Sequence, residues 1–139
     1  MPYLRSSAFI GGFIVFLCTV LSAAHAAEPA FPARPVRFIV PFPPGTSADV
    51  VARLVAQRLG ERLGQQIVID NRAGASGTIG VEIAARATPS GYTWALGTTT
   101  THALARTLNP RLGYDPVGDF APVMLLAESA YFLTPHPGV

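Results

Sequence analysis

The segment Pro35–Leu54, PVRFIVPFPPGTSADVVARL, constrains the fold more than any other part of this sequence. Its apolar start, over about Val36–Pro41, is typical of a buried strand, and a proline-rich loop follows. Thr46, Ser47 and Asp49 then begin an amphipathic helix. Open α/β sheets bind ligands where a strand leads through a short loop into a helix, because the unpaired N–H groups and the helix dipole attract an anion. The segment therefore predicts an α/β fold and a negatively charged ligand.

Strands and helices continue to alternate along the chain. Hydrophobic periodicity and turn residues predict helices over 48–63, 78–87 and 103–108, and further strands over 67–69, 92–96, 123–127 and 131–134. Gly64 is expected to end the first helix. This alternation indicates a doubly wound, mostly parallel sheet with right-handed crossovers. The loops after the first three strands then share one edge of the sheet, where we expect a site: 42–48, 71–77 and 97–102.

The first 26 residues have the composition of a secretory signal peptide. Arg5 precedes an uncharged apolar run, Ala8–Ala24, and the small residues Ala24 and Ala26 form a cleavage site. The alternative is a membrane anchor, but the run is close to the shortest that crosses a bilayer, and the cleavage site favours removal. We therefore expect secretion, loss of Cys18, the only cysteine, and no membrane insertion after cleavage.

Composition and motif spacing argue against several classes of function. All ten Lys and Arg residues are arginine, so the chain has no lysine for a P-loop or a Schiff base. The arginines are scattered and nearly balanced by eight acidic residues, which argues against nucleic-acid binding. Gly74, Gly77 and Gly80 have the spacing G-x-x-G-x-x-G, which differs from the dinucleotide fingerprint G-x-G-x-x-G. Without a metal-ligand spacing, a serine elbow or a mature cysteine, we expect no metal, no cofactor and no enzymatic activity.

Each candidate ligand residue also has a simpler structural explanation. Thr46 and Ser47 could serve only to cap the helix, and Asp49 only to complement its dipole. Gly45 suits either a turn with positive φ or the close approach of a ligand. His102 is the only histidine at the expected ligand edge, but polar residues are also common where helices start. The glycine loop after the second strand is expected to offer backbone N–H groups to a carboxylate.

Four motifs together resemble the tripartite tricarboxylate transporter receptors, also called Bug-type extracytoplasmic solute receptors. They are P-F-x-P-G-x-x-x-D from Pro41, N-R-x-G-A-x-G-x-I-G from Asn71, P-x-G-Y-T from Pro89 and Y-D-P-x-x-D-F-x-P-V from Tyr114. The resemblance extends from about Pro35 to the end of the sequence. Thr46 departs from the family pattern, because a second glycine is common there, and this leaves the identity of the ligand open.

The resemblance implies a periplasmic binding protein of type II, with two lobes that close on a ligand like a Venus flytrap. Such receptors bind organic acids or acidic amino acids and pass them to a membrane permease. They hold ligand carboxylates with loop backbone groups and ordered water rather than with an arginine clamp. The residues that the resemblance places at the ligand are Phe42, Gly45, Thr46, Ser47, Asp49, Ala75, Ser76, Thr98, Thr99 and His102.

The length of the chain limits what the resemblance implies, because receptors of this family are considerably longer. Residues 27–121 are expected to be the N-terminal part of lobe one, and residues 122–139 the start of the crossover to a second lobe that is missing here. We expect such a truncated receptor to bind its ligand poorly, because one lobe cannot bury it. The alternative, from another class, is a small secreted interaction or sensory protein that reuses lobe one and has no transport role.

Overall fold

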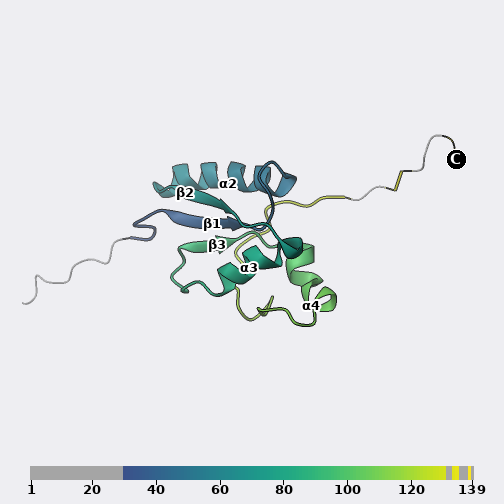
Figure 1. Cartoon of the computed structure of the whole chain (residues 1–139). Coiled ribbons are helices and arrows are strands. Elements are labelled where there is room, and N and C mark those ends of the chain that lie inside the picture. Colours follow the sequence, from purple (N-terminus) through teal and green to yellow (C-terminus); the bar gives the residue numbers. More distant parts are fainter. Residues whose placement is uncertain (1–29, 131–132, 135–137, 139) are drawn as a thin grey trace, which may run out of the picture. The chain divides into compact units, whose positions relative to one another are not determined.

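The computed structural model describes residues 30–130, 133–134 and 138 (Figure 1). The chain divides into two units, Met1–Phe31 and Pro32–Val139. The predicted signal peptide of residues 1–26 lies outside the described residues. Among the helices that the structure describes, none combines the length and the apolar character needed to cross a membrane. The second unit contains the sheet and the three loops of interest.

A parallel sheet of three strands forms the centre of this unit. Strand β1 (Val36–Val40) lies between β2 (Ile67–Asn71) and β3 (Thr93–Ala95), in the order β2-β1-β3. The register pairs Phe38 of β1 with Ile69 on one side and with Trp94 on the other. The predicted α/β class and the parallel direction of the strands are therefore confirmed.

The two longer helices cover opposite faces of the sheet. Helix α2 (Ser47–Leu63) connects β1 to β2, and α3 (Thr78–Ala85) connects β2 to β3 (Figure 1). The first connection leads outward from β1, and the second leads back past β1 to its other side. Because crossovers between parallel strands are right-handed, connections that run in opposite directions place their helices on opposite faces. This is the doubly wound arrangement that the sequence predicts.

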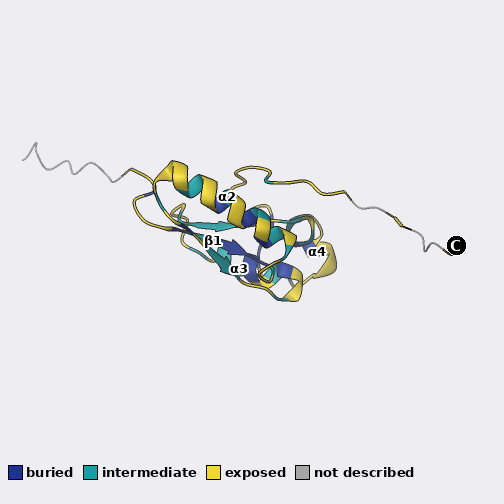
Figure 2. Cartoon of the chain, turned by 90° about the horizontal axis from the view of Figure 1, so that it is seen from above, coloured by how far each residue is buried: buried dark blue, intermediate teal, exposed yellow. Residues whose placement is uncertain are grey.

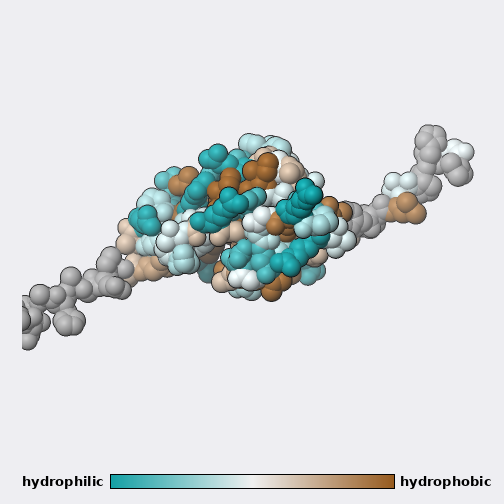
Figure 3. Space-filling view, turned by 60° about the horizontal axis from the view of Figure 1, so that its bottom comes forward, coloured by the Kyte–Doolittle hydropathy of each residue, from teal (hydrophilic) through white to brown (hydrophobic). Residues whose placement is uncertain are grey.

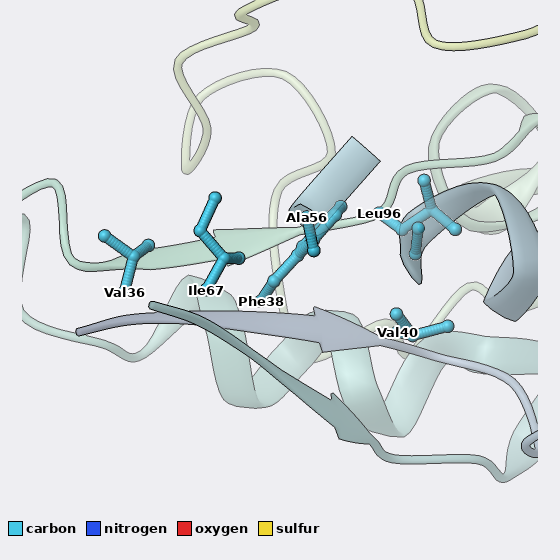
Figure 4. Packing of buried hydrophobic residues seen from close by; sticks show 7 residues of the cluster. Val36, Phe38, Val40, Ala56, Ile67 and Leu96 are labelled. Carbon is cyan, nitrogen blue, oxygen red and sulfur yellow. The ribbon is translucent and has the colours of Figure 1, made fainter. Parts of the chain in front are cut away.

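Alternate residues of β1 build the main core. Val36, Phe38 and Val40 lie in one cluster with Ala52 and Ala56 of helix α2 (Figure 4). The two alanines allow α2 to approach the sheet closely, while its opposite side is exposed (Figure 2). On the other face of the sheet, Ile39 of β1 and Val81 of α3 are each 0% exposed. Both faces of the central strand are thus covered, which explains its nearly continuous apolar sequence.

Helix α2 begins and ends as predicted. Thr46 is its N-cap, and the Thr46 side chain accepts a hydrogen bond from Asp49 N. Gly64 is its C-cap, with a left-handed φ of 65°. The prediction for α3 is less accurate, because α3 ends at Ala85 and not at Ala87. In place of the expected helix over 103–108, the structure has a π-helical turn, Thr99–Ala103, followed by a single α-helical turn, α4 (Ala105–Leu108).

The predicted strand over 123–127 is wrong. These residues adopt no strand structure, and Val123, Met124 and Leu125 are exposed. Leu126 alone packs against the core cluster. In the described residues no strand lies beside β3 on its outer side, so the segment has no partner there for a ladder of hydrogen bonds. The other predicted strand, over 131–134, lies partly outside the described residues, because 131 and 132 are not described.

Candidate ligand-binding site

The three loops after β1, β2 and β3 meet at Gly77. Its backbone has a φ of +92°, and a β-carbon added there would lie 2.8 Å from Thr101 Cγ2 in the third loop. The same β-carbon would lie 3.3 Å from Pro41 O and 3.4 Å from Phe42 Cζ in the first loop. Gly77 itself is buried at the end of the second loop. The predicted convergence of the loops is therefore present in the structure.

The strand order also points to this edge of the sheet as the place for a ligand. The direction in which strands are added reverses between β1 and β3, because β2 lies on one side of β1 and β3 on the other. Open α/β sheets bind ligands outside the carboxyl ends of their strands at such a switch point. The first and third loops follow the two strands that flank it.

The first loop is compact and leads directly into α2. Gly45 has a φ of +83°, and no atom lies within 4 Å of the β-carbon that another residue would place there. The glycine is therefore explained by the backbone conformation rather than by crowding from the protein. The Thr46 hydroxyl donates to Pro43 O at 2.9 Å, and Ser47 is exposed as the first residue of α2. The first N–H groups of a helix have no partner within it, so this end of α2 can receive an anion.

Asp49 lies beneath the first loop. It is 2% exposed, and its carboxylate accepts hydrogen bonds from Arg53 Nε (2.9 Å), Gly45 N (2.9 Å) and Asn71 Nδ2 (2.8 Å). The hydrogen bond from Arg53, followed by those from Gly45 and Asn71, lowers the pKa of Asp49 well below its usual range. Asp49 is thus a charged carboxylate whose two oxygens are both engaged.

The second loop has an unusual backbone. Gly74, Ala75, Ser76 and Gly77 all have positive φ values, 138°, 45°, 56° and 92°. For Ala75 and Ser76 this conformation costs about 1–2 kcal/mol each relative to the right-handed region. Both residues are exposed. Strain of this kind is concentrated at functional sites, and here it occurs just before the first turn of α3.

Hydrogen bonds between threonines shape the third loop. Thr98 and Thr101 form a capping box, in which Thr98 N donates to Thr101 Oγ1 at 2.9 Å. Thr101 is 0% exposed, and its backbone carbonyl accepts a hydrogen bond of 2.6 Å from the Tyr114 hydroxyl. His102 Nδ1 lies 3.0 Å from Thr101 Oγ1, and the His102 ring packs edge-on against Phe120. Burial lowers the pKa of His102, so its ring is neutral at pH 7.

The predicted site residues fall into three groups by exposure. Asp49 is buried, whereas the remaining residues reach the surface fully or in part. The exposed ones are Gly45, Ser47, Ala75, Ser76 and Thr99, and the partly buried ones are Phe42, Thr46, Thr98 and His102. All of them lie on the three converging loops or on the helical turns that follow directly.

Two residues that shape these loops were missed by the sequence analysis as site residues. Asn71 joins the second strand to the first loop, because Asn71 Nδ2 donates to Phe42 O at 3.0 Å and to Asp49 Oδ1 at 2.8 Å. Tyr114 holds the third loop through the carbonyl of Thr101. The available signal for Asn71 was its polar side chain at the carboxyl end of a strand. Tyr114 gave no such signal, since only the fold brings it to Thr101.

The described residues of the site include no cluster of metal-binding side chains, and a large hollow lies elsewhere on the unit. Among the described residues, no three His, Cys, Asp or Glu side chains are close enough together to hold a metal ion. A hollow of about 660 Å³ runs between the outer edge of β2 and α2, where Gln57, Gly60 and Gln66 are among its lining residues. Arg53 lines this hollow and also donates a hydrogen bond to Asp49, which lies beneath the first loop.

Comparison with known proteins links this arrangement to one family. The family model described as "Tripartite tricarboxylate transporter family receptor" matches residues 51–138. Protein BugT of Bordetella pertussis is 38% identical over 138 residues, which are 99% of this chain and 41% of BugT. The chain thus spans about two fifths of the length of that relative.

Two solved structures share the fold of the described unit. MatC from Rhodopseudomonas palustris with bound malate has a TM-score of 0.67 and 45% sequence identity, over 69% of this chain and 33% of MatC. The periplasmic binding protein BugD has a TM-score of 0.63 and 40% identity, over 66% of this chain and 30% of BugD. The fold is therefore that of a periplasmic binding protein of this type, of which the chain contains a part.

Proposed function

We propose that this chain, which belongs to the tripartite tricarboxylate transporter family of receptors, binds a small carboxylate in the periplasm and presents it to a membrane permease. The family consists of periplasmic solute-binding receptors and not of enzymes, in agreement with the sequence prediction. An organic acid or an acidic amino acid is the expected ligand class, and the bound malate of MatC supports it.

The convergence of the three loops at Gly77 is the observation that carries this proposal. It places the start of α2, the strained loop before α3 and the Thr98–Thr99 turn at one edge of the sheet. N–H groups at helix starts and threonine hydroxyls donate hydrogen bonds, and a carboxylate accepts them. We propose that the contacts come from the predicted residues Phe42, Gly45, Thr46, Ser47, Ala75, Ser76, Thr98, Thr99 and His102, with Asp49 below them.

The domain boundaries and the cellular location form part of the same proposal. Residues 1–26 act as a signal peptide, residues 27–121 form part of lobe one, and residues 122–139 begin the crossover toward a second lobe. In two-lobed binding proteins, hinge closure encloses the ligand between the lobes. The described loops would supply one wall of that site. We therefore expect this chain alone to bind malate with a Kd in the millimolar range, or about −4 kcal/mol.

An NMR titration of the ¹⁵N-labelled chain with malate tests the proposal at this affinity. We expect the amide resonances of Ser47, Ala75, Ser76 and Thr98 to shift with a common Kd, while the neutral diamide of malate has no effect. Calorimetry provides an independent value of Kd. Shifts that are absent, or that occur instead along the β2–α2 hollow, would show that the converging loops are not the site. A micromolar Kd would contradict the view that a second wall is needed.

A charge placed in the second loop provides the matching variant. Ser76→Asp should weaken malate binding by about tenfold or more, because the exposed carboxylate would repel the ligand at close range. Ser90→Asp is the control, since Ser90 is also exposed but lies before β3, at the amino ends of the strands. Equal effects of the two substitutions would indicate a general effect of net charge and contradict a site at the second loop.

A further inference from the structure

The proline content of the first loop leaves it with few backbone donors. Residues 41–45 read PFPPG, so only Phe42 and Gly45 have an N–H group in this segment. Such a loop cannot be held by its own backbone ladder, and its shape must come from hydrogen bonds to other segments. Besides the hydrogen bond from the Thr46 hydroxyl to Pro43 O, the structure provides one at Phe42 and one at Gly45.

The hydrogen bonds at Phe42 and Gly45 both go to side chains outside the loop. Asn71 Nδ2, at the end of β2, donates to Phe42 O at 3.0 Å. Asp49 Oδ2, in the first turn of α2, accepts from Gly45 N at 2.9 Å. The two side chains are joined to each other by the hydrogen bond of 2.8 Å from Asn71 Nδ2 to Asp49 Oδ1. The loop is therefore held on both sides of Pro43 and Pro44.

Arg53 completes the arrangement and balances its charge. Arg53 Nε donates to Asp49 Oδ2 at 2.9 Å, and Arg53 Nη2 donates to Asn71 Oδ1 at 3.1 Å. Asp49 is 2% exposed, which keeps its carboxylate away from the surface of the loop. An unpaired carboxylate at that surface would repel an anionic ligand, but this one is ionised, buried and paired.

We propose that Asp49 and Asn71 form a clamp, here called the Asp49–Asn71 clamp, that fixes the first loop in its binding conformation without touching the ligand. The inference rests on the proposed carboxylate site and assigns to Asp49 a positioning role in place of the ligand contact that the family resemblance implies. The clamp raises affinity because it orders the loop before the ligand arrives, so that binding does not have to order it.

Asn71→Asp is the most direct test, because it keeps the size of the side chain and removes both of its donated hydrogen bonds. We expect malate binding to weaken by about tenfold, because the loop loses the hydrogen bond to Phe42 O and the new carboxylate repels that of Asp49, so the clamp opens. In the ligand-free protein, the Gly45 and Thr46 amide resonances should shift, and the Gly45 amide should exchange faster with solvent. Asn109→Asp is the matched control, because Asn109 is exposed and lies at the end of α4.

The reciprocal variant Asp49→Asn/Asn71→Asp separates positioning from general stability. It can restore a hydrogen bond between the two side chains, but the new carboxylate cannot donate to Phe42 O. We expect its melting temperature to recover toward the wild-type value while malate binding stays weak. Recovery of both would overturn the role of the Phe42 hydrogen bond. Should Asn71→Asp fail to fold, Asp49→Asn tests the Gly45 side of the clamp, because it removes the charge that accepts from Gly45 N. Unchanged malate binding and an unchanged Gly45 exchange rate in that variant would overturn the clamp.

The outcomes distinguish this inference from the proposed function. If the wild-type chain binds malate at the three loops and Asn71→Asp binds it equally well, the clamp is wrong and the site remains. If the wild-type chain does not bind malate, the proposed function fails, while faster exchange of the Gly45 amide in Asn71→Asp still supports the clamp as the device that holds the loop.

Discussion

His102 combines partial burial with a position in the third loop. Its ring lies against Phe120, and a β-carbon added to Gly97 would be 2.9 Å from His102 Cε1. Because burial penalises the charged imidazolium, the pKa of His102 lies below its usual value of 6.5. The folded state therefore takes up the proton of this residue less readily than the unfolded state does.

This difference predicts a loss of stability in mild acid. Above pH 6.5 the His102 ring is neutral in both states, and as the pH falls toward the lowered pKa the unfolded state binds more protons. The free energy of unfolding should therefore decrease between pH 7 and pH 5, and His102→Gln should make that decrease smaller. Denaturant unfolding at each pH measures the free energy of unfolding. His136→Gln is the control variant, because it shows how much of the decrease comes from a histidine other than His102. An unchanged slope in His102→Gln would contradict the prediction.

The individual residues differ in how far the sequence could identify them. Gly64 is confirmed as the C-cap of α2, and of the two N-cap candidates, Thr46 and Ser47, the structure selects Thr46. Capping is predictable to this extent because it follows from local residue types. Asn71 and Tyr114 were not identified as site residues, because their partners are Phe42, Asp49 and Thr101, which only the tertiary fold brings near. Asp49 was placed at the site by its motif, but its burial under the loop depends on the packing of α2.

At the level of secondary-structure elements, the close packing of three loops depends on Gly77. A side chain there would need both a left-handed backbone and space that Thr101 Cγ2 already occupies at 2.8 Å. Gly45 has a similar φ of +83° but no neighbouring atom within 4 Å of the added β-carbon. The two glycines therefore separate the cost of conformation from the cost of crowding.

Gly77→Ala should be more destabilising than Gly45→Ala. Both substitutions carry about 1–2 kcal/mol for the left-handed conformation, and the contact with Thr101 should add about 1–3 kcal/mol at Gly77. Thr101→Ser removes the obstructing methyl group and keeps the hydroxyl, so it should recover part of the loss in the double variant. Unfolding free energies of the wild type, the three single variants and the double variant test this. Equal losses for the two glycine variants would show that the loops do not meet closely at Gly77.

Helices and strands with a strong periodic pattern of apolar residues were predicted more accurately than segments without one. Strand β1 and helix α2 carry strong periodic patterns, and their predicted positions are confirmed within a residue or two. Residues 123–127 have an apolar strand-like sequence, but a strand also requires a neighbour, and none of the described segments provides one beside β3. Apolar side chains that remain exposed on the unit, between polar ones, are visible on the face shown in Figure 3.

For the molecule as a whole, the strand order predicts a gradient of stability. Strand β1 donates backbone hydrogen bonds to both sides, as in Val36 N to Gln66 O and Arg37 N to Tyr92 O, each 2.9 Å long. Strands β2 and β3 are the edges of the described sheet. Amides of β1 should therefore exchange with solvent slowest, close to the rate set by global unfolding, and alternate amides of β3 should exchange much faster.

Hydrogen–deuterium exchange followed by NMR measures this gradient residue by residue. Uniform protection of all β3 amides would contradict it, and would mean that another strand covers the outer edge of β3 in solution. Repeating the measurement at several protein concentrations shows whether a second copy provides that strand, since protection by association depends on concentration.

The central position of β1 also affects the order in which a nascent chain can complete its fold. Strand β1 is the first of the three strands to be translated. The pairing of Phe38 is complete only after Ile69 of β2 and then Trp94 of β3 have been translated. Parallel neighbours require a whole crossover helix between them, so no local hairpin can begin the sheet early. The complete sheet of a nascent chain with this topology cannot form until β3 has been translated. The order of the strands therefore makes β3, the last strand to be made, the element on which completion of the central pairing depends.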